Sequence, residues 1–566
     1  MPATKRKATG AHFTPPDLGI LVAERLDRMM KSFAGPIRVL DPACGDGNLL
    51  RAMVKVLPQE ILQRVTLVGI ESDAASFAAL RSRQSEFGIC RTELIRGDFL
   101  DLFDDRGLFG RSHTIEPVDV IVANPPYVRT QIMGAKRAQA LAARFGLSGR
   151  VDLYQAFLVA MAKQLRPGGV LGVIMSNRFL TTKGGMATRR FLRLNFEILE
   201  LVDLGDTKLF EAAVLPALVF ARKQCETMPS RSHRQPDFIR IYEANDGEGD
   251  DSDVSRSVLD CLRNPRSGLY RSNGTTYRVA AGNIPIPEDD SRPWTMLTES
   301  ESEWVALVDA AACCRVGDVA KVRVGIKTTA DNVFIRSDWS TLPPDRRPER
   351  RHLRALLSQK DAAKWRPLPA RRLRNEVIYT HEVVSGRRRA IRFNENSPTW
   401  KYLLENREQL ESRKYVIDAG RAWYELWVPQ DPAAWSLPKI VFPDISSEPK
   451  FFLDKTECIV DGNCYWITTN DGVDEELLLL ILGVANSALM NRYHGLAFQN
   501  KLYSQRRRHL TQYVTEYPIP DRDAKASRQL VEIVRKLSHE TLTGDQRDRY
   551  ASEVDRLTFL AFGIDQ

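Results

Sequence analysis

The chain has 566 residues, of which 43% are hydrophobic and 27% charged, so it is long enough for two or three domains that each bury a core. Its formal net charge of +9 suits a polyanionic partner, although many basic proteins have none. The sequence lacks an apolar run of about 18 residues that would predict a membrane span, a secretory signal and cysteines at zinc-ligand spacing, so we expect a reduced, cytoplasmic protein.

The first predicted region, residues 1–225, alternates short apolar runs with helical patterns. The expected helices include Leu49–Val56 and Tyr154–Gln164. The expected strands are Ile37–Leu40, Val65–Ile70, Glu93–Ile95, Val118–Ala123, Val170–Met175, Glu200–Asp203 and Ala217–Ala221. Because strands that are apolar throughout are buried on both faces, this alternation predicts an α/β domain with a mainly parallel sheet between layers of helices.

Two further regions follow. Residues 226–300 are polar, contain many turn formers and carry an acidic cluster, which indicates a linker or a loop-rich insertion. Residues 301–566 combine mixed strand patterns, proline-bounded segments and arginine clusters, and they end in a helix-forming tail from about Ala524. We therefore expect a second, mixed α+β domain in residues 301–566.

A glycine-bearing turn follows the first predicted strand and leads into a helix. The segment Asp41–Asn48 reads DPACGDGN, and Gly45 and Gly47 allow its backbone to approach a ligand closely. A strand, a glycine turn and a helix form a corner of the kind that binds nucleotides. Its spacing differs from the dinucleotide fingerprint and it lacks the lysine of a phosphate-binding loop, so the corner alone does not define its ligand.

Acidic residues end three successive predicted strands. Asp41 ends the first strand, Glu71 the second and Asp98 the third. Ligands of open α/β sheets bind at the carboxyl ends of the strands, where Glu71 can accept both hydroxyls of a ribose. Asp98 can accept from an adenine amino group, and Phe99 can flank the adenine ring. Any one of these acids could instead cap a helix, but three in order favour a nucleoside-containing ligand.

The fourth predicted strand, Val118–Ala123, leads into the loop Asn124, Pro125, Pro126 and Tyr127. An exocyclic aromatic amine is a poor nucleophile because its lone pair is delocalised into the ring. The Asn124 side-chain oxygen and the Pro125 carbonyl can accept its two hydrogens and draw the nitrogen towards tetrahedral geometry. The prolines fix the backbone, and Tyr127 can stack on the base. The loop therefore suits transfer of a methyl group to such a nitrogen by positioning, without a strong base.

In this order the motifs resemble those of the gamma-class, TaqI-like Type II N6-adenine DNA methyltransferases. The similarity spans residues 10 to about 223 and includes the early segment Gly10–Pro16, a helix at Asp152–Phe157 and a strand at Gly168–Ile174. It implies a Rossmann-like S-adenosylmethionine-dependent methyltransferase domain, followed by a C-terminal target-recognition domain. The implied activity is methylation of adenine N6 in duplex DNA, as the modification component of a restriction–modification system.

The resemblance also assigns roles to single residues. The implied S-adenosylmethionine contacts are Thr14, Asp41, Ala43, Gly45, Gly47, Glu71, Asp98, Phe99 and Asn124. The catalytic loop, Asn124 to Tyr127, would hold the adenine after it leaves the duplex. The family also stacks a later aromatic residue on the flipped base. Phe220 is our candidate for that residue, although a core position explains it equally well.

The second domain resembles the recognition domains of the same family in patches. Val324–Ile335 is predicted to form a strand, a turn and a second strand, and it resembles the start of these domains. Lys439–Ser446 and Leu482–Leu489 resemble later strands, and Tyr517–Pro520 follows them. Arginine clusters are frequent here, and phosphate contacts would supply affinity while base contacts supply sequence choice. The candidate DNA-binding residues are Lys327, Arg387, Arg388, Arg506 and Arg507. Each cluster could equally be a solvated face or pair with nearby acids.

One pair of acidic residues resembles the metal-binding pair of a nuclease site. Asp444 and Glu448 precede Lys450, an order that could bind Mg²⁺, but Pro449 separates the charges and we interpret the segment as a strand end and turn. We expect no metal and no fused nuclease domain. The expected partners are double-stranded DNA and a separately encoded cognate restriction endonuclease, with the methyltransferase itself a monomer.

Three other readings stay open. The same loop occurs in methyltransferases that act on RNA or on a protein glutamine amide, but these are typically shorter and lack a large basic C-terminal domain. A catalytically inactive DNA-binding specificity protein need not retain all four loop residues. N4-cytosine methyltransferases use similar chemistry but usually carry Ser at the first loop position.

Overall fold

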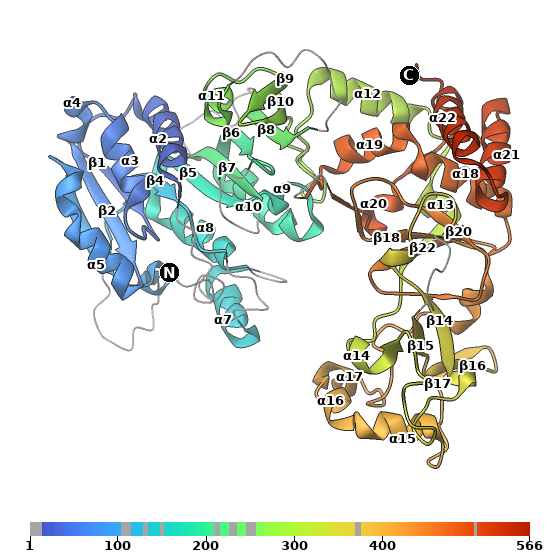
Figure 1. The fold of residues 1–566 in the computed structure, drawn as a ribbon. Coiled ribbons are helices and arrows are strands. Elements are labelled where there is room, and N and C mark those ends of the chain that lie inside the picture. Colours follow the sequence, from blue (N-terminus) through green and yellow to red (C-terminus); the bar gives the residue numbers. More distant parts are fainter. Residues whose placement is uncertain are drawn as a thin grey trace. The chain divides into compact units, whose positions relative to one another are not determined.

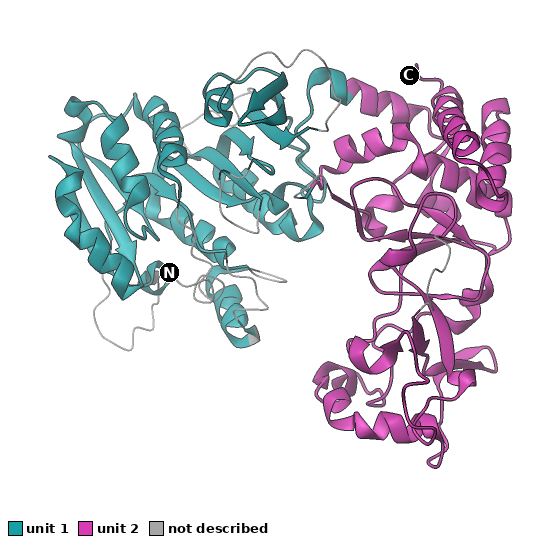
Figure 2. Ribbon diagram, viewed as in Figure 1, with its two compact units in different colours: residues 1–302, 502–505 teal, residues 303–501, 506–566 magenta. Residues whose placement is uncertain are grey.

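The computed structural model describes residues 14–103, 115–127, 134–147, 152–207, 209, 215–225, 235–244, 256–367, 375–502 and 506–565. The chain divides into two compact units (Figure 2). Unit 1 comprises residues 1–302 and 502–505, and unit 2 comprises residues 303–501 and 506–566. The division after Ser302 lies two residues from the expected start of the second domain. No helix in the described ranges is long and apolar enough to cross a membrane.

A ten-stranded sheet forms the centre of unit 1, in the order β3-β2-β1-β4-β5-β7-β6-β8-β10-β9 (Figure 1). The strands are β1 (Ile37–Asp41), β2 (Val65–Glu71), β3 (Arg91–Arg96), β4 (Val118–Ala123), β5 (Leu165–Ser176), β6 (Phe196–Asp203), β7 (Pro216–Lys223), β8 (Asp237–Glu243), β9 (Gly268–Ser272) and β10 (Thr275–Asn283). The neighbouring strands β3, β2, β1, β4 and β5 are parallel to one another, and β7 runs antiparallel to both its neighbours, β5 and β6. The strands predicted within residues 1–225 and the α/β fold class are confirmed.

Helices cover both faces of this sheet. They are α2 (Pro16–Met30), α3 (Asn48–Val56), α4 (Gln59–Leu62), α5 (Ala74–Ser82), α7 (Ala135–Phe145), α8 (Leu153–Gln164), α9 (Arg178–Thr181), α10 (Met186–Asn195) and α11 (Val258–Arg263), with α12 (Glu299–Ala310) at the unit boundary. Successive strand residues point to opposite faces. Accordingly Val39 and Val120 lie in the core under α2 and α3, whereas Leu40 and Ile121 lie in the core under α8.

The described part of the region expected to be a linker or a loop-rich insertion, residues 235–244 and 256–300, contributes strands to the sheet. Strand β8 pairs in parallel with β6, and β10 and β9 follow it in antiparallel order. Phe238, Ile239 and Ile241 of β8 are buried. Strands β8 and β10 mix apolar residues with charged and polar ones and are bordered by polar sequence, so composition did not reveal them. The acidic cluster in residues 245–255 lies outside the described residues.

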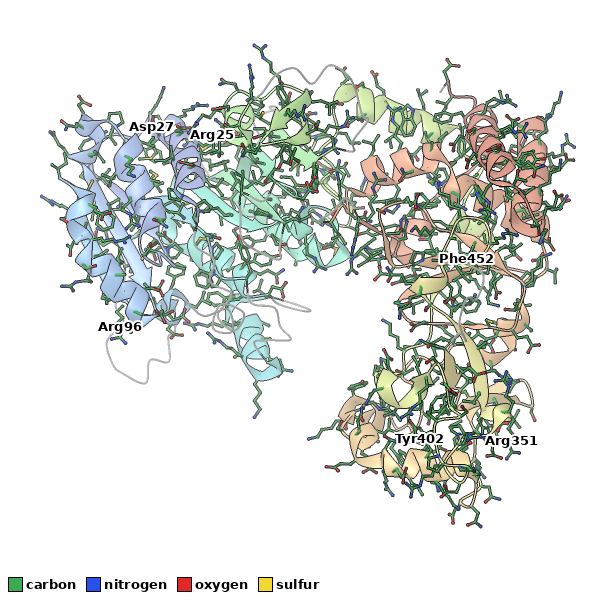
Figure 3. The ribbon with its side chains drawn as sticks, viewed as in Figure 1. Arg25, Asp27, Arg96, Arg351, Tyr402 and Phe452 are labelled. Carbon is green, nitrogen blue, oxygen red and sulfur yellow. The ribbon has the colours of Figure 1, made fainter. Side chains whose placement is uncertain are left out.

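Buried arginines tie this added region to the rest of unit 1. Arg25 of α2, labelled in Figure 3, pairs with Glu200 of β6 at 2.9 Å and donates to the Leu262 carbonyl of α11 at 2.6 Å. Arg189 of α10 is fully buried and donates to the carbonyls of Phe179, Leu180, Thr182, Asp290 and Ser291. Each guanidinium thus joins segments that are far apart in the sequence.

Unit 2 contains two small sheets with separate cores. The first has the order β12-β22-β18-β20 and packs against C-terminal helices; the second has the order β13-β15-β14-β21 and is covered by short helices. Two-stranded pairs join β16 to β17, β11 to β24 and β19 to β23. The strands are β11 (Cys314–Arg315), β12 (Ala320–Val324), β13 (Ile335–Arg336), β14 (Leu353–Leu357), β15 (Glu376–Ile378), β16 (His381–Val384), β17 (Arg387–Ala390), β18 (Lys439–Pro443), β19 (Ile445–Ser446), β20 (Phe452–Asp454), β21 (Ile459–Val460), β22 (Cys464–Thr469), β23 (Arg507–Arg508) and β24 (Pro518–Ile519).

The helices of unit 2 confirm the predicted tail and correct two predicted strands. They are α13 (Val316–Val319), α14 (Asp331–Phe334), α15 (Pro398–Glu405), α16 (Arg407–Glu411), α17 (Lys414–Asp418), α18 (Glu475–Asn486), α19 (Ala488–Phe498), α20 (Thr511–Val514), α21 (Lys525–His539) and α22 (Gly544–Ala561). The second half of the Val324–Ile335 segment is a helical turn, and Leu482–Leu489 lies in α18 and α19. Helix α18 is apolar on all sides because protein surrounds it, and Asp474 caps it by accepting from Leu477 N at 2.9 Å.

The substitution Arg189→Met should lower the free energy of unfolding of unit 1 by about 3 kcal/mol, because it leaves several buried carbonyls without a donor. Urea unfolding followed by tryptophan fluorescence measures this, since Trp294 is fully buried beside the segment that Arg189 holds. Arg190→Met removes the same charge from a mostly exposed side chain and serves as the control. Equal unfolding midpoints for the two variants would contradict the role of Arg189.

Candidate active site

The parallel strands bring the predicted site residues to one edge of the sheet. Asp41 ends β1, Glu71 ends β2, and Asn124 directly follows β4. Strand β1 lies between β2 and β4, so these side chains come from three neighbouring strand ends. The fold therefore assembles the expected ligand-binding edge.

The glycine turn between β1 and α3 requires its glycines. Gly45 and Gly47 have φ angles of 57° and 86°, a backbone region that side chains with a Cβ rarely adopt. A Cβ on Gly47 would also lie 2.6 Å from Leu80 Cδ1. Arg51, which sequence reasoning missed, braces the turn by donating to the Asp46 carbonyl at 2.6 Å. No sequence signal marks it, because arginine is common on helices.

Glu71 connects the glycine turn to the next helix. One carboxylate oxygen accepts from Gly45 N at 2.8 Å, and the other accepts from Asp73 N at 2.6 Å. Burial raises the pKa of Glu71, although the two backbone donors oppose that shift. The carboxylate is thus held in one orientation at the end of β2, where a ribose would lie.

Asp41 is the most buried acid of the site, with 1% of its surface exposed. Burial, together with the negative charge of Glu71, raises the pKa of Asp41 to about 8, and a hydrogen bond from Ala43 N at 3.2 Å opposes the shift. A carboxyl group buried in this way favours a positively charged ligand, because a nearby positive charge stabilises the ionised carboxylate.

Asp98 and Phe99 follow β3 at the same edge. Asp98 accepts from Leu100 N at 3.0 Å and lies 3.5 Å from the Arg137 guanidinium of α7. Phe99 is buried and its ring lies 5.8 Å from that of Phe157 in α8. Phe99 therefore helps to build the wall of the domain, and its contact with an adenine ring stays a prediction.

Asn124 is held between Thr14, which is far away in the sequence, and Tyr127 of its own loop. Its side-chain nitrogen donates to Thr14 Oγ1 at 3.1 Å, and its side-chain oxygen accepts from the Tyr127 hydroxyl at 2.9 Å. The Thr14 carbonyl in turn lies 3.4 Å from the Asn48 side-chain nitrogen, at the end of the glycine turn. Thr14 thus links the cofactor corner to the catalytic loop. Pro125 is buried, while Pro126 and Tyr127 are partly buried.

The expectation for Phe220 needs correction. Phe220 lies in the middle of β7, opposite Gly172 of β5, and none of its surface is exposed. A flipped base could reach this ring only by opening the core. An aromatic residue that stacks on a base has to lie at the carboxyl edge of the sheet instead.

The candidate DNA-binding residues differ in their surroundings. Arg387 and Arg388 are exposed on β17, and Arg506 and Lys327 are exposed as well. Arg507 is partly buried and donates to both the carbonyl and the side-chain oxygen of Asn491, so its contacts are internal. Other clusters pair with acids, as in Arg346–Glu405, Arg350–Glu376 and Arg351–Glu349.

The acids of the apparent nuclease pattern have basic partners. Asp444 lies 3.5 Å from Arg508, and Glu448 lies 3.6 Å from Lys450. Within the described ranges, no group of three or more acidic, histidine or cysteine side chains is arranged to hold a metal ion. All eight cysteines are free thiols.

Comparison with known proteins identifies the two halves of the chain. Residues 91–210 match the family model of the Eco57I restriction-modification methylase, and residues 387–519 match that of the TaqI-like C-terminal specificity domain. Type II methyltransferase M.BanIII of Aneurinibacillus aneurinilyticus is 43% identical over 572 residues, which cover 99% of this chain and 98% of that protein. Type II methyltransferase M.BstVI of Geobacillus stearothermophilus is 23% identical over 96% of this chain and 92% of its own.

Among solved structures, the cryo-electron microscopy structure of a DrdV–DNA complex matches 94% of this chain and 57% of that one, with a TM-score of 0.53 and 12% identity. This likeness concerns the fold. The sheet, the glycine turn and the acidic strand ends define an S-adenosylmethionine-dependent methyltransferase. The chain belongs to the TaqI-like Type II methyltransferase family, and it is a DNA methyltransferase of the restriction–modification type.

Affinity for S-adenosylmethionine should rise with pH between about 6 and 8. The cofactor carries positive charges on its sulfonium and ammonium groups, so it favours the ionised form of Asp41, and binding releases the proton that Asp41 holds below its pKa of about 8. The dissociation constant, measured by calorimetry, should fall by up to about tenfold per pH unit. In the variant Asp41→Asn the dissociation constant should change little with pH. The variant Glu60→Gln, which alters an exposed acid, should keep the wild-type pH dependence. A wild-type affinity that does not change with pH would contradict the prediction.

Proposed function

We propose that this methyltransferase transfers the methyl group to N6 of adenine in duplex DNA, after the adenine has rotated out of the helix. The observation that carries the proposal is the Asn124 amide, whose oxygen and nitrogen have separate partners at the carboxyl edge of the sheet. S-adenosylmethionine supplies an electrophilic methyl group when bound. The acids and glycines of the edge fit its ribose and its positive charges.

In this proposal Asn124 and Pro125 accept the two hydrogens of the adenine amine. Because Thr14 fixes the amide nitrogen, the amide oxygen keeps its orientation towards Tyr127. Two acceptors on the amine draw its lone pair out of the ring, so nitrogen becomes nucleophilic where the methyl group is presented. Methyl transfer makes the nitrogen positively charged and acidic, and its surplus proton then passes to water.

Before a base arrives, the Tyr127 hydroxyl donates to the same oxygen that would accept from the adenine amine. When the Tyr127 ring turns to stack on the base, the amine can take the place of this hydroxyl. Burial raises the pKa of Tyr127 well above its ordinary value, so the residue stays a neutral hydrogen-bond donor at physiological pH. The exchange replaces one hydrogen bond to Asn124 with another and adds stacking.

The substitution Asn124→Ala should lower kcat about 100- to 1000-fold, because it removes one of the two acceptors on the amine. DNA affinity in filter binding should change by less than about threefold, since unit 2 is untouched. Asn195→Ala, in which only a contact with the Phe191 carbonyl is lost, provides the control. Digestion of product DNA followed by mass spectrometry identifies the base, and N4-methylcytosine in place of N6-methyladenine would refute the proposed substrate.

The substitution Tyr127→Phe should keep kcat within about threefold, because the ring remains and only the competing hydroxyl is lost. Tyr127→Ala should lose about 10- to 100-fold in kcat/KM, since stacking on the base is lost. Fluorescence of 2-aminopurine at the target position reports base rotation separately from chemistry. If Tyr127→Phe were as damaging as Tyr127→Ala, the hydroxyl would have a direct role in methyl transfer.

A further inference from the structure

An exposed two-stranded hairpin projects from unit 2. Its strands, β16 and β17, pair only with each other, and every residue from 382 to 389 is exposed. The two turn residues, Ser385 and Gly386, have φ angles of 50° and 72°. Two successive positive φ angles define the tight hairpin turn whose twist matches that of its strands. The hairpin is therefore a short, regular ribbon.

The register of the hairpin assigns its side chains to two faces. His381 pairs with Ala390 and Val383 with Arg388, while Glu382 pairs with Arg389 and Val384 with Arg387. Paired residues share a face and successive residues alternate between faces. One face therefore carries His381, Val383 and Arg388. The other carries a second set: Glu382, Val384, Arg387 and Arg389.

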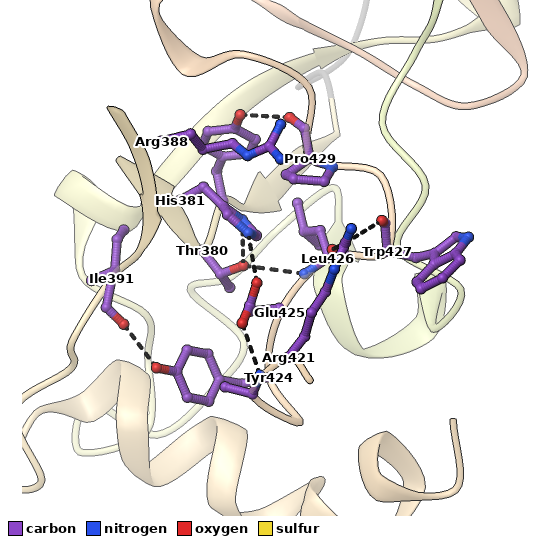
Figure 4. Close-up of polar contacts among 12 residues, drawn as sticks. Thr380, His381, Arg388, Ile391, Arg421, Tyr424, Glu425, Leu426, Trp427 and Pro429 are labelled. Atoms are coloured by element: carbon purple, nitrogen blue, oxygen red, sulfur yellow. Dashed lines mark hydrogen bonds and ion pairs between the residues drawn. The ribbon is translucent and has the colours of Figure 1, made fainter. Parts of the chain in front are cut away.

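The face that carries Arg388 is attached to the body of unit 2 (Figure 4). Arg388 donates to the Gln430 carbonyl at 2.9 Å, and the His381 ring lies 3.1 Å from the Glu425 carboxylate. This face of the ribbon points towards the segment around residues 425–430. The opposite face, with Arg387 and Arg389, consequently points away from the protein.

The base of the ribbon, where the two strands join unit 2, is also fixed (Figure 4). Ile391 N donates to the Thr380 carbonyl at 2.9 Å, and the Tyr424 hydroxyl donates to the Ile391 carbonyl at 3.1 Å. Leu426 N donates to Thr380 Oγ1 at 3.3 Å. A ribbon anchored at its base with a free outer face is pre-organised to meet a partner, because little conformational freedom is left to lose.

The outward arginines differ from several nearby arginines of unit 2. Arg346, Arg350, Arg351 and Arg407 each pair with a carboxylate. Within the described ranges, neither Arg387 nor Arg389 forms an ion pair, although Glu382 shares their face. Their charge is left for a partner of opposite sign. DNA, the substrate class of this family, is such a partner.

We propose that the outward face of this hairpin enters the major groove of DNA and reads base edges there. The major groove, about 12 Å wide, admits a two-stranded ribbon. Arg387 and Arg389 each have the planar fork that pairs with the O6 and N7 atoms of guanine, and Glu382 can accept from the amino group of cytosine. The inference rests on the proposed function, and it adds that the target site contains at least one G·C pair chosen by this face.

Three single substitutions separate base reading from simple charge. Arg387→Ala, Arg389→Ala and Arg392→Ala each remove one positive charge from an exposed side chain, but only the first two change the outward face of the hairpin. Each full-length variant methylates a pool of duplexes with randomised sequence, and sequencing of the methylated positions gives its motif. We expect Arg387→Ala or Arg389→Ala to relax one position of the motif by about 10- to 100-fold. Arg392→Ala, which lies beyond β17, should retain the wild-type motif.

The opposite result is well defined. If all three variants kept the wild-type motif and lost affinity equally, with a salt dependence reduced by about one charge, the arginines would contact phosphates only and the proposal would be overturned. Thermal melting of the three variants checks that the hairpin change leaves unit 2 folded. The methylated base is read separately in the same products, so an error in the proposed adenine chemistry does not imitate an error about the hairpin.

Discussion

The hydrogen bond from Asn124 to Thr14 is the contact that joins the two halves of the active site. Thr14 lies just before α2 and also meets the glycine turn through Asn48, whereas Asn124 follows β4. Parallel pairing of β1 with β2 and β4 places these segments side by side at one edge. The cofactor corner and the catalytic loop are therefore positioned by one rigid sheet, and a change in either is transmitted to the other.

Strands β1 to β5 of unit 1 could be predicted from the sequence because each one is marked by a short local pattern. A buried parallel strand is a short apolar run, and the residue after it falls at the ligand-binding edge. The structure places Asp41, Glu71 and Asn124 at three neighbouring strand ends, as that rule predicts, and their contacts with S-adenosylmethionine stay a prediction. Arg51 and Arg189 could not be found, because their roles depend on carbonyl groups that only the folded chain brings near.

The differences between expectation and structure have two physical causes. Helix α18 and Phe220 are apolar in sequence, which predicts that they are buried but not which element they form or what they contact. Strands β8 to β10 were missed because charged and polar residues lie within and beside them. The arginine clusters illustrate the same limit. Arg387 and Arg388 are adjacent and chemically identical, yet strand register turns one outward and one towards the protein.

Under the proposed function, the contact between Tyr127 and Asn124 also bears on which bases the site accepts. The exocyclic amine of a bound base would donate to the Asn124 oxygen, as the tyrosine hydroxyl does in this structure. Thymine has no such amine, so a thymine that displaced the hydroxyl would not replace its hydrogen bond, at a cost of about 1 kcal/mol. This hydrogen bond would therefore favour bases with an amino group over thymine without any steric clash.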